Sequence, residues 1–284
     1  MRIIGISLVA NAVRLDFPIV PALKSVLPLC DEVIVNVGPS DDGTLDLVRS
    51  VGDPRVRVIH GVWDRSAGGG MLAVETQRAL DAAKGDWAVY IQADEVLHED
   101  GIPLIREALG TVNGERGVEG LLAEYVHFYG SFDTIGTNRR WYRREVRVVR
   151  LGSGVMSHGD AQGFRVGSER RRIRARRSGA RMFHYGWARS PQALAAKRDA
   201  HAEIWGAKQD WASTGPLLRR EYGLAPFRGA HPQVAAAWVR ERMDQRTSLA
   251  EMRWNRDQIR FLVSDWIERL TGWEPFVHRN YVEV

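Results

Sequence analysis

Short apolar runs that end abruptly in polar residues recur through the N-terminal third of the chain. They are Ile3 to Val9, Val33 to Val37, Val56 to His60 and Ala88 to Ile91. Short runs of this kind, bounded by polar loops, are typical of buried strands, whereas helices need a longer periodic segment. We therefore predict a strand at each run.

The segments between these runs carry apolar residues at helical spacing. They are Phe17 to Leu29, Leu45 to Val51, Met71 to Ala83 and, after the last run, Gly101 to Leu109. Such alternation is typical of a parallel sheet, because parallel strands need a crossover connection. Further strands are predicted at Gly120 to Phe128, Arg147 to Val149, Phe164 to Val166 and Arg181 to Phe183. The predicted fold class is α/β, a mixed sheet flanked by helices.

The character of the sequence changes at Pro191. Beyond it lie helix-compatible segments rich in Ala, Arg, Glu and Trp, which are Pro191 to Trp205, Val234 to Arg246 and Met252 to Leu270. We predict a sheet domain over residues 1–190 and a helical extension over residues 191–284. The tryptophans of the extension are expected to pack its helices together. A homodimer surface and peripheral docking on a membrane are the alternatives.

Polar residues follow three of the predicted strands. Asn11 follows the first strand, the turn from Gly38 to Thr44 follows the second, and Asp94 and Glu95 follow the fourth. Ligands of open α/β sheets bind at the carboxyl ends of the strands. Carboxylates at the end of a buried strand are costly unless a cation or hydrogen-bond donors meet them. This edge of the sheet is therefore the predicted site.

On these residues the chain resembles family-2-like glycosyltransferases of the GT-A fold. The resemblance rests on Ile4 to Asn11, on Asp41 to Thr44, and on Gln92 to Glu95, which stand where the family carries its DxD-type motif. Gln92 departs from the pattern, since many members carry an aspartate there. The resemblance covers most of residues 1–190. It implies a hexosyltransferase that moves a sugar from a nucleotide-diphosphate donor to a hydroxyl acceptor with inversion.

The resemblance also implies roles for individual residues. Those expected to bind the nucleotide sugar are Val9, Asn11, Arg14, Asp41, Asp42, Gln92, Ala93 and Asp94. A divalent cation, Mn²⁺ or Mg²⁺, is expected at the diphosphate, where it would neutralise charge as the sugar–oxygen bond breaks. Its expected ligands are Asp94, Glu95 and His184. Two other interpretations stay open, with Asn11 as a helix cap and Asp41 and Asp42 as parts of an ordinary turn.

His184 lies at the end of an apolar run, within Met182 to Trp187. This segment, followed by Arg189 and Lys197, is similar to one in family-2-like proteins that carry a helical tail. In many GT-A enzymes a histidine downstream of the DxD motif completes the cation shell or contacts the diphosphate. A half-buried histidine that is bonded to the backbone is the alternative.

An inverting transfer needs a general base that takes the proton of the acceptor hydroxyl. Besides Asp94, the candidates are Asp160, in a polar loop between strands, and Asp133, which follows the strand Gly120 to Phe128. The acceptor is expected to be a saccharide, a lipid-linked molecule or another hydroxyl compound. Aromatic residues that form either core or an acceptor platform are His127, Tyr129, Trp141 and Tyr142.

Composition narrows the remaining classes. The 284 residues, 44% of them apolar, suffice for one large domain with an appendage. Because Cys30 is the single cysteine, an internal disulfide and a Cys-rich zinc site are excluded. No apolar run is long enough to span a membrane, so we expect a cytoplasmic protein, with association at the cytoplasmic face of a membrane as the alternative.

Arginines concentrate between residues 165 and 181. They are Arg165, Arg170, Arg171, Arg172, Arg174, Arg176, Arg177 and Arg181. Such a cluster attracts phosphate, nucleic acid or anionic lipid, but the alternation also fits a strand with one solvated face, so nucleic acid is not an expected partner. Two other function classes stay open. One is a non-catalytic nucleotide- or polyanion-binding protein on the same fold, and the other is a nucleotidyltransferase, whose Gly-rich loop is missing from Val9 to Ala12.

Overall fold

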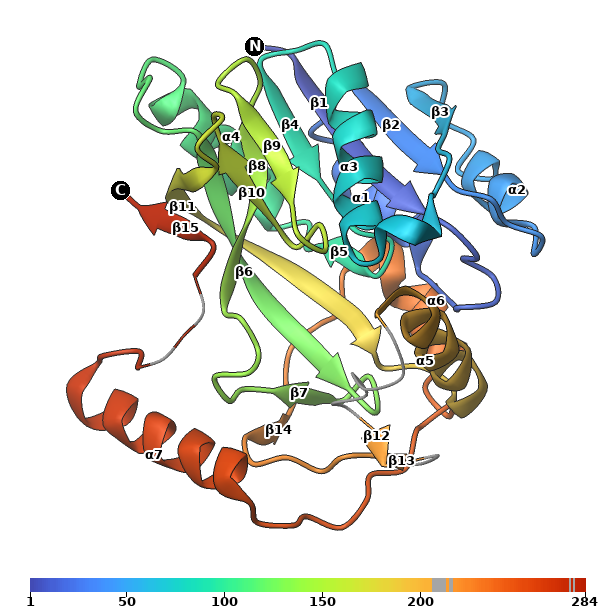
Figure 1. Cartoon of the computed structure of the whole chain (residues 1–284), viewed down its shortest axis with the longest axis vertical. Helices are drawn as coiled ribbons and strands as arrows, with labels where there is room; N and C mark the ends of the chain where they lie inside the picture. The colour runs from blue at the N-terminus through green and yellow to red at the C-terminus, as the bar shows by residue number, and fades with distance from the viewer. Residues whose placement is uncertain (206–212, 215–216, 276, 278) are drawn as a thin grey trace.

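The computed structural model describes residues 1–205, 213–214, 217–275, 277 and 279–284. A large mixed sheet runs through the molecule, with helices packed on it (Figure 1). Its strands follow the order β3 (Val56–His60), β2 (Glu32–Val37), β1 (Ile3–Val9), β4 (Trp87–Tyr90), β8 (Arg144–Arg150), β6 (Gly120–Tyr129), β11 (Arg171–Trp187), β10 (Gly163–Val166) and β9 (Val155–His158). The predicted α/β class is confirmed.

The strands that bear the predicted site are parallel. β3, β2, β1 and β4 run in one direction, so their carboxyl ends share one edge. β8 is antiparallel to both β4 and β6, and β11 is parallel to β6. Short strands pair at the margins, namely β5 (Glu95–Leu97), β7 (Thr134–Gly136), β14 (Leu224–Pro226) and β15 (Tyr281–Glu283), while β12 (Ser213–Thr214) pairs with β13 (Leu217–Leu218).

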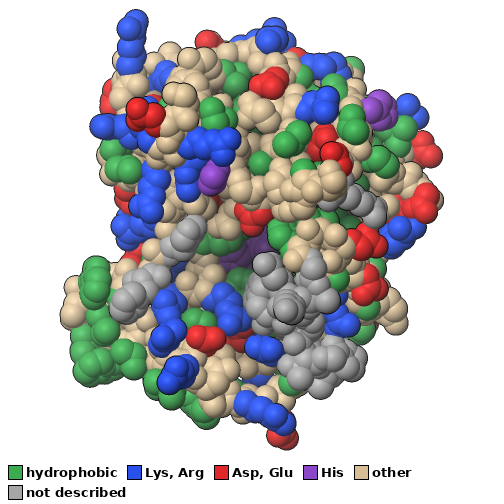
Figure 2. Space-filling model, in the orientation of Figure 1, with side chains coloured by type: hydrophobic (Ala, Val, Ile, Leu, Met, Phe, Trp, Pro, Cys, Tyr) green, Lys and Arg blue, Asp and Glu red, His purple; other side chains and the backbone are tan. Residues whose placement is uncertain are grey.

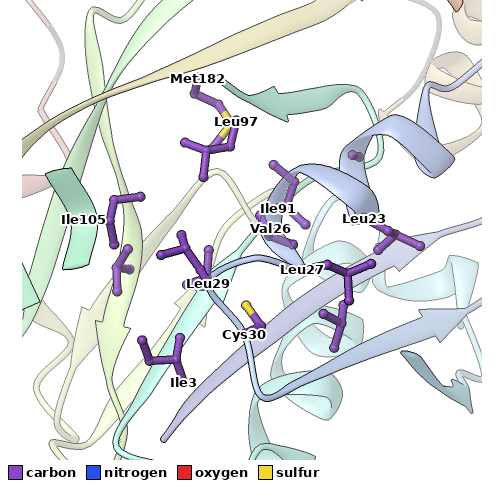
Figure 3. Packing of buried hydrophobic residues seen from close by; sticks show 14 of the residues in the cluster. Ile3, Leu23, Val26, Leu27, Leu29, Cys30, Ile91, Leu97, Ile105 and Met182 are labelled. Atoms are coloured by element: carbon purple, nitrogen blue, oxygen red, sulfur yellow. The ribbon is translucent and has the colours of Figure 1, made fainter. Parts of the chain in front are cut away.

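Strand β1 is buried on both faces, because its side chains alternate between two apolar layers. Ile3 and Val9 belong to the layer that includes α1 (Ile19–Val26) and α4 (Gly101–Val112). Figure 3 shows this layer, to which α1 contributes Leu23 and Val26, α4 contributes Ile105 and the strands contribute residues such as Ile3. Ile4 and Ile6 belong to the other layer, with α3 (Gly70–Ala82). A continuous apolar run is what a strand covered on both faces requires.

Strand β11 is much longer than the sequence predicts. The sequence predicts a short strand at Arg181 to Phe183 and offers the arginine alternation as a strand with one solvated face, and β11 joins both in 17 residues from Arg171 to Trp187. The alternation of buried and exposed side chains explains why the strand extends this far. Ile173 and Ala175 are buried, whereas Arg172 and Arg174 are exposed. Several of these arginines form ion pairs, which are Arg171–Glu119, Arg176–Glu115, Arg177–Glu283 and Arg181–Asp100. The cluster is the solvated face of a strand.

The segment beyond Pro191 is more than the helical extension that the sequence predicts. Its helices are α5 (Pro191–Trp205), the 3₁₀ helix η3 (Gln233–Ala235), α6 (Ala236–Arg240) and α7 (Arg256–Thr271). The helix predicted over Val234 to Arg246 ends at Arg240, after which the chain turns and Arg242 pairs with Asp16. Strands β14 and β15 pair with β7 and β11, so the extension contributes to the main sheet.

Two further helices belong to the described chain. These are α2 (Thr44–Arg49) and the 3₁₀ helix η1 (Arg65–Ala67), which lies just before α3. Over the described residues, no helix combines the length and the apolar character that a membrane span requires.

Helix α4 offers a matched test of the core. We expect Leu109→Ala, at a fully buried position, to lower the free energy of unfolding by about 3 kcal/mol, because it removes apolar contacts and leaves a cavity. Leu104→Ala, on the same helix but 38% exposed, should cost less than about 1 kcal/mol. Urea denaturation of both variants measures the difference. Equal losses would contradict the packing described for α4.

Candidate active site

Asp94 is held at the carboxyl edge of the sheet by strand pairing. It lies between β4 and β5, and β5 pairs antiparallel with β11, so that Glu95 lies opposite His184. The backbone carbonyl of Asp94 accepts a hydrogen bond from the N–H of Tyr185 at 2.8 Å. This register brings the C-terminal end of β11 against the end of β4. Asp94 itself is 9% exposed.

Three basic side chains surround the Asp94 carboxylate. Its Oδ2 atom lies 3.3 Å from Lys197 Nζ, 3.3 Å from Arg189 Nη2 and 3.6 Å from His184 Nε2. Burial would raise the pKa of Asp94, but Lys197, His184 and Arg189 outweigh burial and hold that pKa well below its usual value. Asp94 is therefore an anion at neutral pH, and its charge is compensated by Arg189, which follows β11, and by Lys197 on α5.

Two of the basic partners of Asp94, Arg189 and Lys197, are held in place by further contacts. Arg189 is 1% exposed, donates to the carbonyl oxygens of Gly186 and Leu15, and lies over the ring of Phe17. Lys197 donates to the Gly186 carbonyl at 2.9 Å and lies 4.9 Å from the centre of the Trp187 ring. Burial lowers the pKa of Lys197 to about 8, although Asp94 opposes the shift. Most of the ammonium therefore stays charged at neutral pH.

His184 is oriented by a second histidine. His127 Nε2 lies 2.8 Å from the carbonyl oxygen of Tyr142, and His127 Nδ1 lies 2.9 Å from His184 Nδ1. The pKa of His127 is held well below its usual value, mainly by burial and to a smaller extent by the neighbouring His184. His127 is therefore neutral. The hydrogen-bond network then assigns its proton to Nε2, and His184 donates through Nδ1. This leaves His184 Nε2 directed toward Asp94.

Gly186 leaves the space in which these groups meet. A Cβ atom at this position would lie 2.4 Å from His184 Nε2 and 3.1 Å from Asp94 Oδ2. Any side chain here would displace the imidazole, because real Cβ contacts are not this short. The glycine within the segment Met182 to Trp187 is therefore a requirement of the site.

A cleft of about 660 Å³ opens above Asp94, a size typical of sites for small ligands. Figure 2 shows this hollow in the face of the molecule, with histidine visible inside it. The predicted site residues that line the cleft are Val9, Gln92, Ala93, Asp94, Asp160 and His184. Among the predicted aromatic residues, His127, Trp141 and Tyr142 line it, whereas Tyr129 is buried beside it.

The other nucleotide-binding candidates form a separate, adjoining network. Arg14 Nη2 pairs with Asp41 at 2.5 Å, and the N–H of Arg14 donates to Asp42 at 2.7 Å. Asp42 also accepts from the Thr44 hydroxyl at 2.5 Å. The N–H of Asn11 donates to the Ser40 hydroxyl, so Asn11 joins the same contact between the loops after β1 and β2. The structure brings these loops together, but outside the lining of the cleft.

Glu95 does not join Asp94. Its carboxylate points to the other side of the strand and receives two hydrogen bonds from Arg147, at 2.8 and 3.0 Å, and one from the Tyr125 hydroxyl at 2.6 Å. Glu95 and Arg147 are both at most 1% exposed. The prediction of Glu95 as a metal ligand is therefore corrected, because the Glu95 carboxylate is held by Arg147 and Tyr125 on the side away from Asp94.

Asp133 also lies apart from the cleft. Its carboxylate accepts from Ser131 at 2.5 Å and pairs with Arg246 at 2.8 Å, in the loop after β6. Asp160, by contrast, lies on the wall of the cleft and is exposed. The structure thus separates the two candidates for the general base.

Helix α5 supplies wall residues to which the sequence gave no role. Lys197, Ala200, His201, Ile204 and Trp205 all face the cleft. One signal for Lys197 existed, since it is a lysine in a chain that otherwise favours arginine, on a segment rich in alanine. The cleft wall is thus completed by the segment that the sequence predicts as an extension.

The residues present fit a divalent cation with a small protein ligand set. Asp94 Oδ2 and His184 Nε2 face each other at 3.6 Å, and His127 fixes the tautomer of His184, as partners of ligating histidines do. The described residues contain no group of three or more His, Cys, Asp or Glu side chains suited to a metal. Two protein ligands still suffice where substrate phosphates and water supply the others.

Arg147 tests the structural interpretation of Glu95. We expect Arg147→Met to lower the free energy of unfolding by about 3 to 5 kcal/mol, because it leaves a buried carboxylate without its counter-charge. The double variant with Glu95→Gln should recover part of this loss. Arg176→Met, which removes a partly exposed ion pair to Glu115, should cost less than about 1 kcal/mol. Chemical denaturation of the three variants measures these differences in the free energy of unfolding.

Comparison with known proteins completes the description of the site. Residues 18–168 match the model of the family described as glycosyl transferase family 2. A search of curated proteins finds no match.

Solved structures similar to the chain include TarS of S. aureus, with 20% identity over 46% of this chain and 22% of that one and a TM-score of 0.36. TarS 1-349 in complex with UDP-GlcNAc gives 21% identity over 46% and 36%, with a TM-score of 0.36. Glucosyl-3-phosphoglycerate synthase from Mycobacterium tuberculosis, in complex with Mn²⁺, UDP and phosphoglyceric acid, gives 22% over 44% and 43%, with a TM-score of 0.33. The chain thus covers less than half the length of each of these structures.

Proposed function

The chain belongs to glycosyl transferase family 2, and from this premise we propose that it transfers the sugar of a nucleotide-diphosphate donor to a hydroxyl group of an acceptor. The observation that carries the proposal is the ionised Asp94 at the bottom of a cleft, with Lys197 and Arg189 beside it. A fold alone supports many functions, so the argument rests on this site.

The charges around Asp94 suit a diphosphate. One carboxylate against Lys197 and Arg189 leaves a net positive charge in a largely buried place, where electrostatic attraction is stronger than in water. We propose that Lys197 contacts the diphosphate, because its ammonium lines the cleft while Arg189 lies behind Asp94 with 1% exposure. A fixed cation here favours departure of the nucleoside diphosphate, on which negative charge develops.

The same geometry suggests a place for a divalent metal ion. We propose that Asp94 and His184 hold Mn²⁺ or Mg²⁺. A divalent cation bound there would neutralise further charge on the leaving diphosphate. Asp94 is suited to the ligand role because its pKa is held well below the usual value. The same property makes Asp94 a poor general base.

The proton of the acceptor hydroxyl needs another carboxylate, and Asp160 is the proposed general base. It lines the cleft, whereas Asp133 is bound to Arg246 elsewhere. A base that is separate from the residues at the diphosphate is what an inverting transfer requires, since the acceptor attacks from the side opposite the leaving group. We propose inversion on this ground.

The two ends of the cleft suit different parts of the reactants. Leu8, Val9 and Ala10 from the end of β1 line the side next to the loops that hold Arg14, Asp41 and Asp42, which we propose as the nucleoside side. Aromatic residues line the cleft as well, and they suit the apolar faces of a hexose in the donor or in a saccharide or lipid-linked acceptor. They are Trp63, Tyr90, Trp141, Tyr142, Trp187 and Trp205.

Donor binding can be measured by thermal shift with UDP, GDP, CDP, dTDP and their sugar conjugates, each with Mn²⁺, Mg²⁺ or chelator. One base should stabilise the protein, and a ligand at a hundredfold excess over its Kd contributes about 2.7 kcal/mol, or roughly 5 °C in Tm. Asp94→Asn should lose the shift, because it removes the charge that orders the cluster. Asp133→Asn, which alters an aspartate outside the cleft, should keep it. A folded protein that no nucleotide stabilises would refute the proposal.

Lys197 is tested separately by titration calorimetry with the stabilising nucleoside diphosphate. Lys197→Met should weaken binding at least about tenfold, since a hydrogen bond to a charged group contributes about 1.5 to 3 kcal/mol. The affinity for the matching nucleoside, which has no phosphate, should change little. Lys24→Met, at an exposed lysine on α1, is the control. Equal weakening for nucleoside and diphosphate would remove Lys197 from the phosphate site.

A further inference from the structure

Helix α7 carries an apolar stripe on its exposed side. The stripe consists of Ile259, Leu262, Val263, Trp266 and Leu270, which are 52%, 40%, 46%, 63% and 65% exposed. Their spacing places them on one face of the helix. In Figure 1 α7 forms an outer edge of the molecule, and Figure 2 shows hydrophobic side chains gathered there. We propose that this stripe docks on the surface of a lipid bilayer that contains anionic lipid.

The opposite face of α7 is packed against the rest of the protein. The stripe is therefore exposed although the helix itself is held in place. Phe261 is buried beneath the guanidinium groups of Arg139 and Arg140. The Tyr222 hydroxyl donates to Asp265 at 2.7 Å, and Arg143 donates to Glu268 at 2.7 Å. The core-facing side of α7 is therefore polar and ion-paired, and its apolar side faces out.

The ends of the helix are equally well defined. The Asn255 side chain accepts from the N–H groups of Asp257 and Gln258, and Gly272 ends the helix with a positive φ of 70°. A helix with good caps and a fixed inner face keeps its outer residues in register. The stripe is thus a stable surface feature.

The size of the stripe favours a bilayer over a second copy of the chain. From Ile259 to Leu270 the helix is about 17 Å long and about 10 Å wide, which gives a footprint on the order of 200 Å². A stable protein interface buries about 800 Å² on each partner. An interfacial helix needs no matching partner surface, because its affinity comes from apolar side chains entering the headgroup region.

Charge favours anionic lipid. Arg253, Arg256, Arg260 and Arg269 are exposed along α7 and at its start. Among the described contacts of the helix, Asp257 pairs with Arg260 at 3.8 Å, Asp265 with Arg269 at 3.0 Å and Glu268 with Arg143, which leaves Arg253 and Arg256 as the exposed arginines with no acidic partner in this set. The whole chain carries a formal charge of +5. Arginines beside tryptophan and aliphatic side chains are what the interface of an anionic membrane attracts.

Vesicle flotation with the full chain tests the proposal. The protein should float with phosphatidylcholine–phosphatidylglycerol vesicles, bind less to phosphatidylcholine alone, and be released partly by salt. The double variant Trp266→Ser/Leu270→Ser should weaken binding at least about tenfold, because two apolar side chains no longer enter the bilayer. Val62→Ser, at an apolar residue 70% exposed far along the chain from α7, should bind as the unaltered protein does.

Each other result would overturn the proposal. No flotation of the unaltered protein, or equal flotation of the double variant, would exclude α7 as the docking element. Sedimentation velocity in the absence of lipid adds a further outcome, because a dimer that the double variant abolishes would assign the stripe to a second copy. Unchanged Tm values for both variants confirm that the fold is intact, and nucleotide-induced shifts report on the proposed function independently of lipid.

Discussion

A buried, ionised carboxylate at the end of β4 is the constraint on which the site depends. Asp94 is 9% exposed, and leaving it unpaired there would cost several kcal/mol. Its counter-charges come from Arg189 and Lys197, which lie 95 and 103 residues further along the chain, and His184 approaches the same carboxylate. The parallel half of the sheet therefore cannot complete its own site. It requires the end of β11 and helix α5, which also form a wall of the cleft.

Two adjacent carboxylates have opposite roles because a strand begins between them. Asp94 faces the cleft, whereas Glu95 is the first residue of β5 and points to Arg147. The Arg147 guanidinium also lies 5.2 Å from the centres of the Tyr90 and Tyr125 rings, so this buried ion pair is enclosed by aromatic side chains. Glu95 thus anchors the turn from one side, while Asp94 faces the cleft from the other.

The sequence predicts the sheet well, and it predicts the place of Asp94 at the carboxyl edge of that sheet, for a physical reason. Apolar runs such as Ile3 to Val9 report burial directly, and the topology then requires the strand ends to meet at one edge. The sequence could not reveal which way the Glu95 side chain points, because this depends on the pairing of β5 with β11. Nor could it reveal that Lys197 approaches Asp94, because no local pattern encodes that contact. The alternation of arginines did indicate a strand with a solvated face, but the sequence could not show that this strand continues into Arg181 to Trp187 as one β11.

The path from α7 to the cleft is short and made of strong contacts. Arg143 and Arg144 bind Glu268 and Glu274 around the end of α7, and Arg144 opens β8, which pairs with β4 just before Asp94. A bilayer bound by the stripe on α7 would therefore be connected to the strands under the cleft through these ion pairs, which would favour a fixed orientation of the cleft to its surface. Orientation of this kind lowers the entropic cost of bringing a surface-bound hydroxyl to the donor, because the search is confined to two dimensions. On the two proposals taken together, the docking helix would set the orientation of the cleft, and the chemistry would stay with the residues around Asp94.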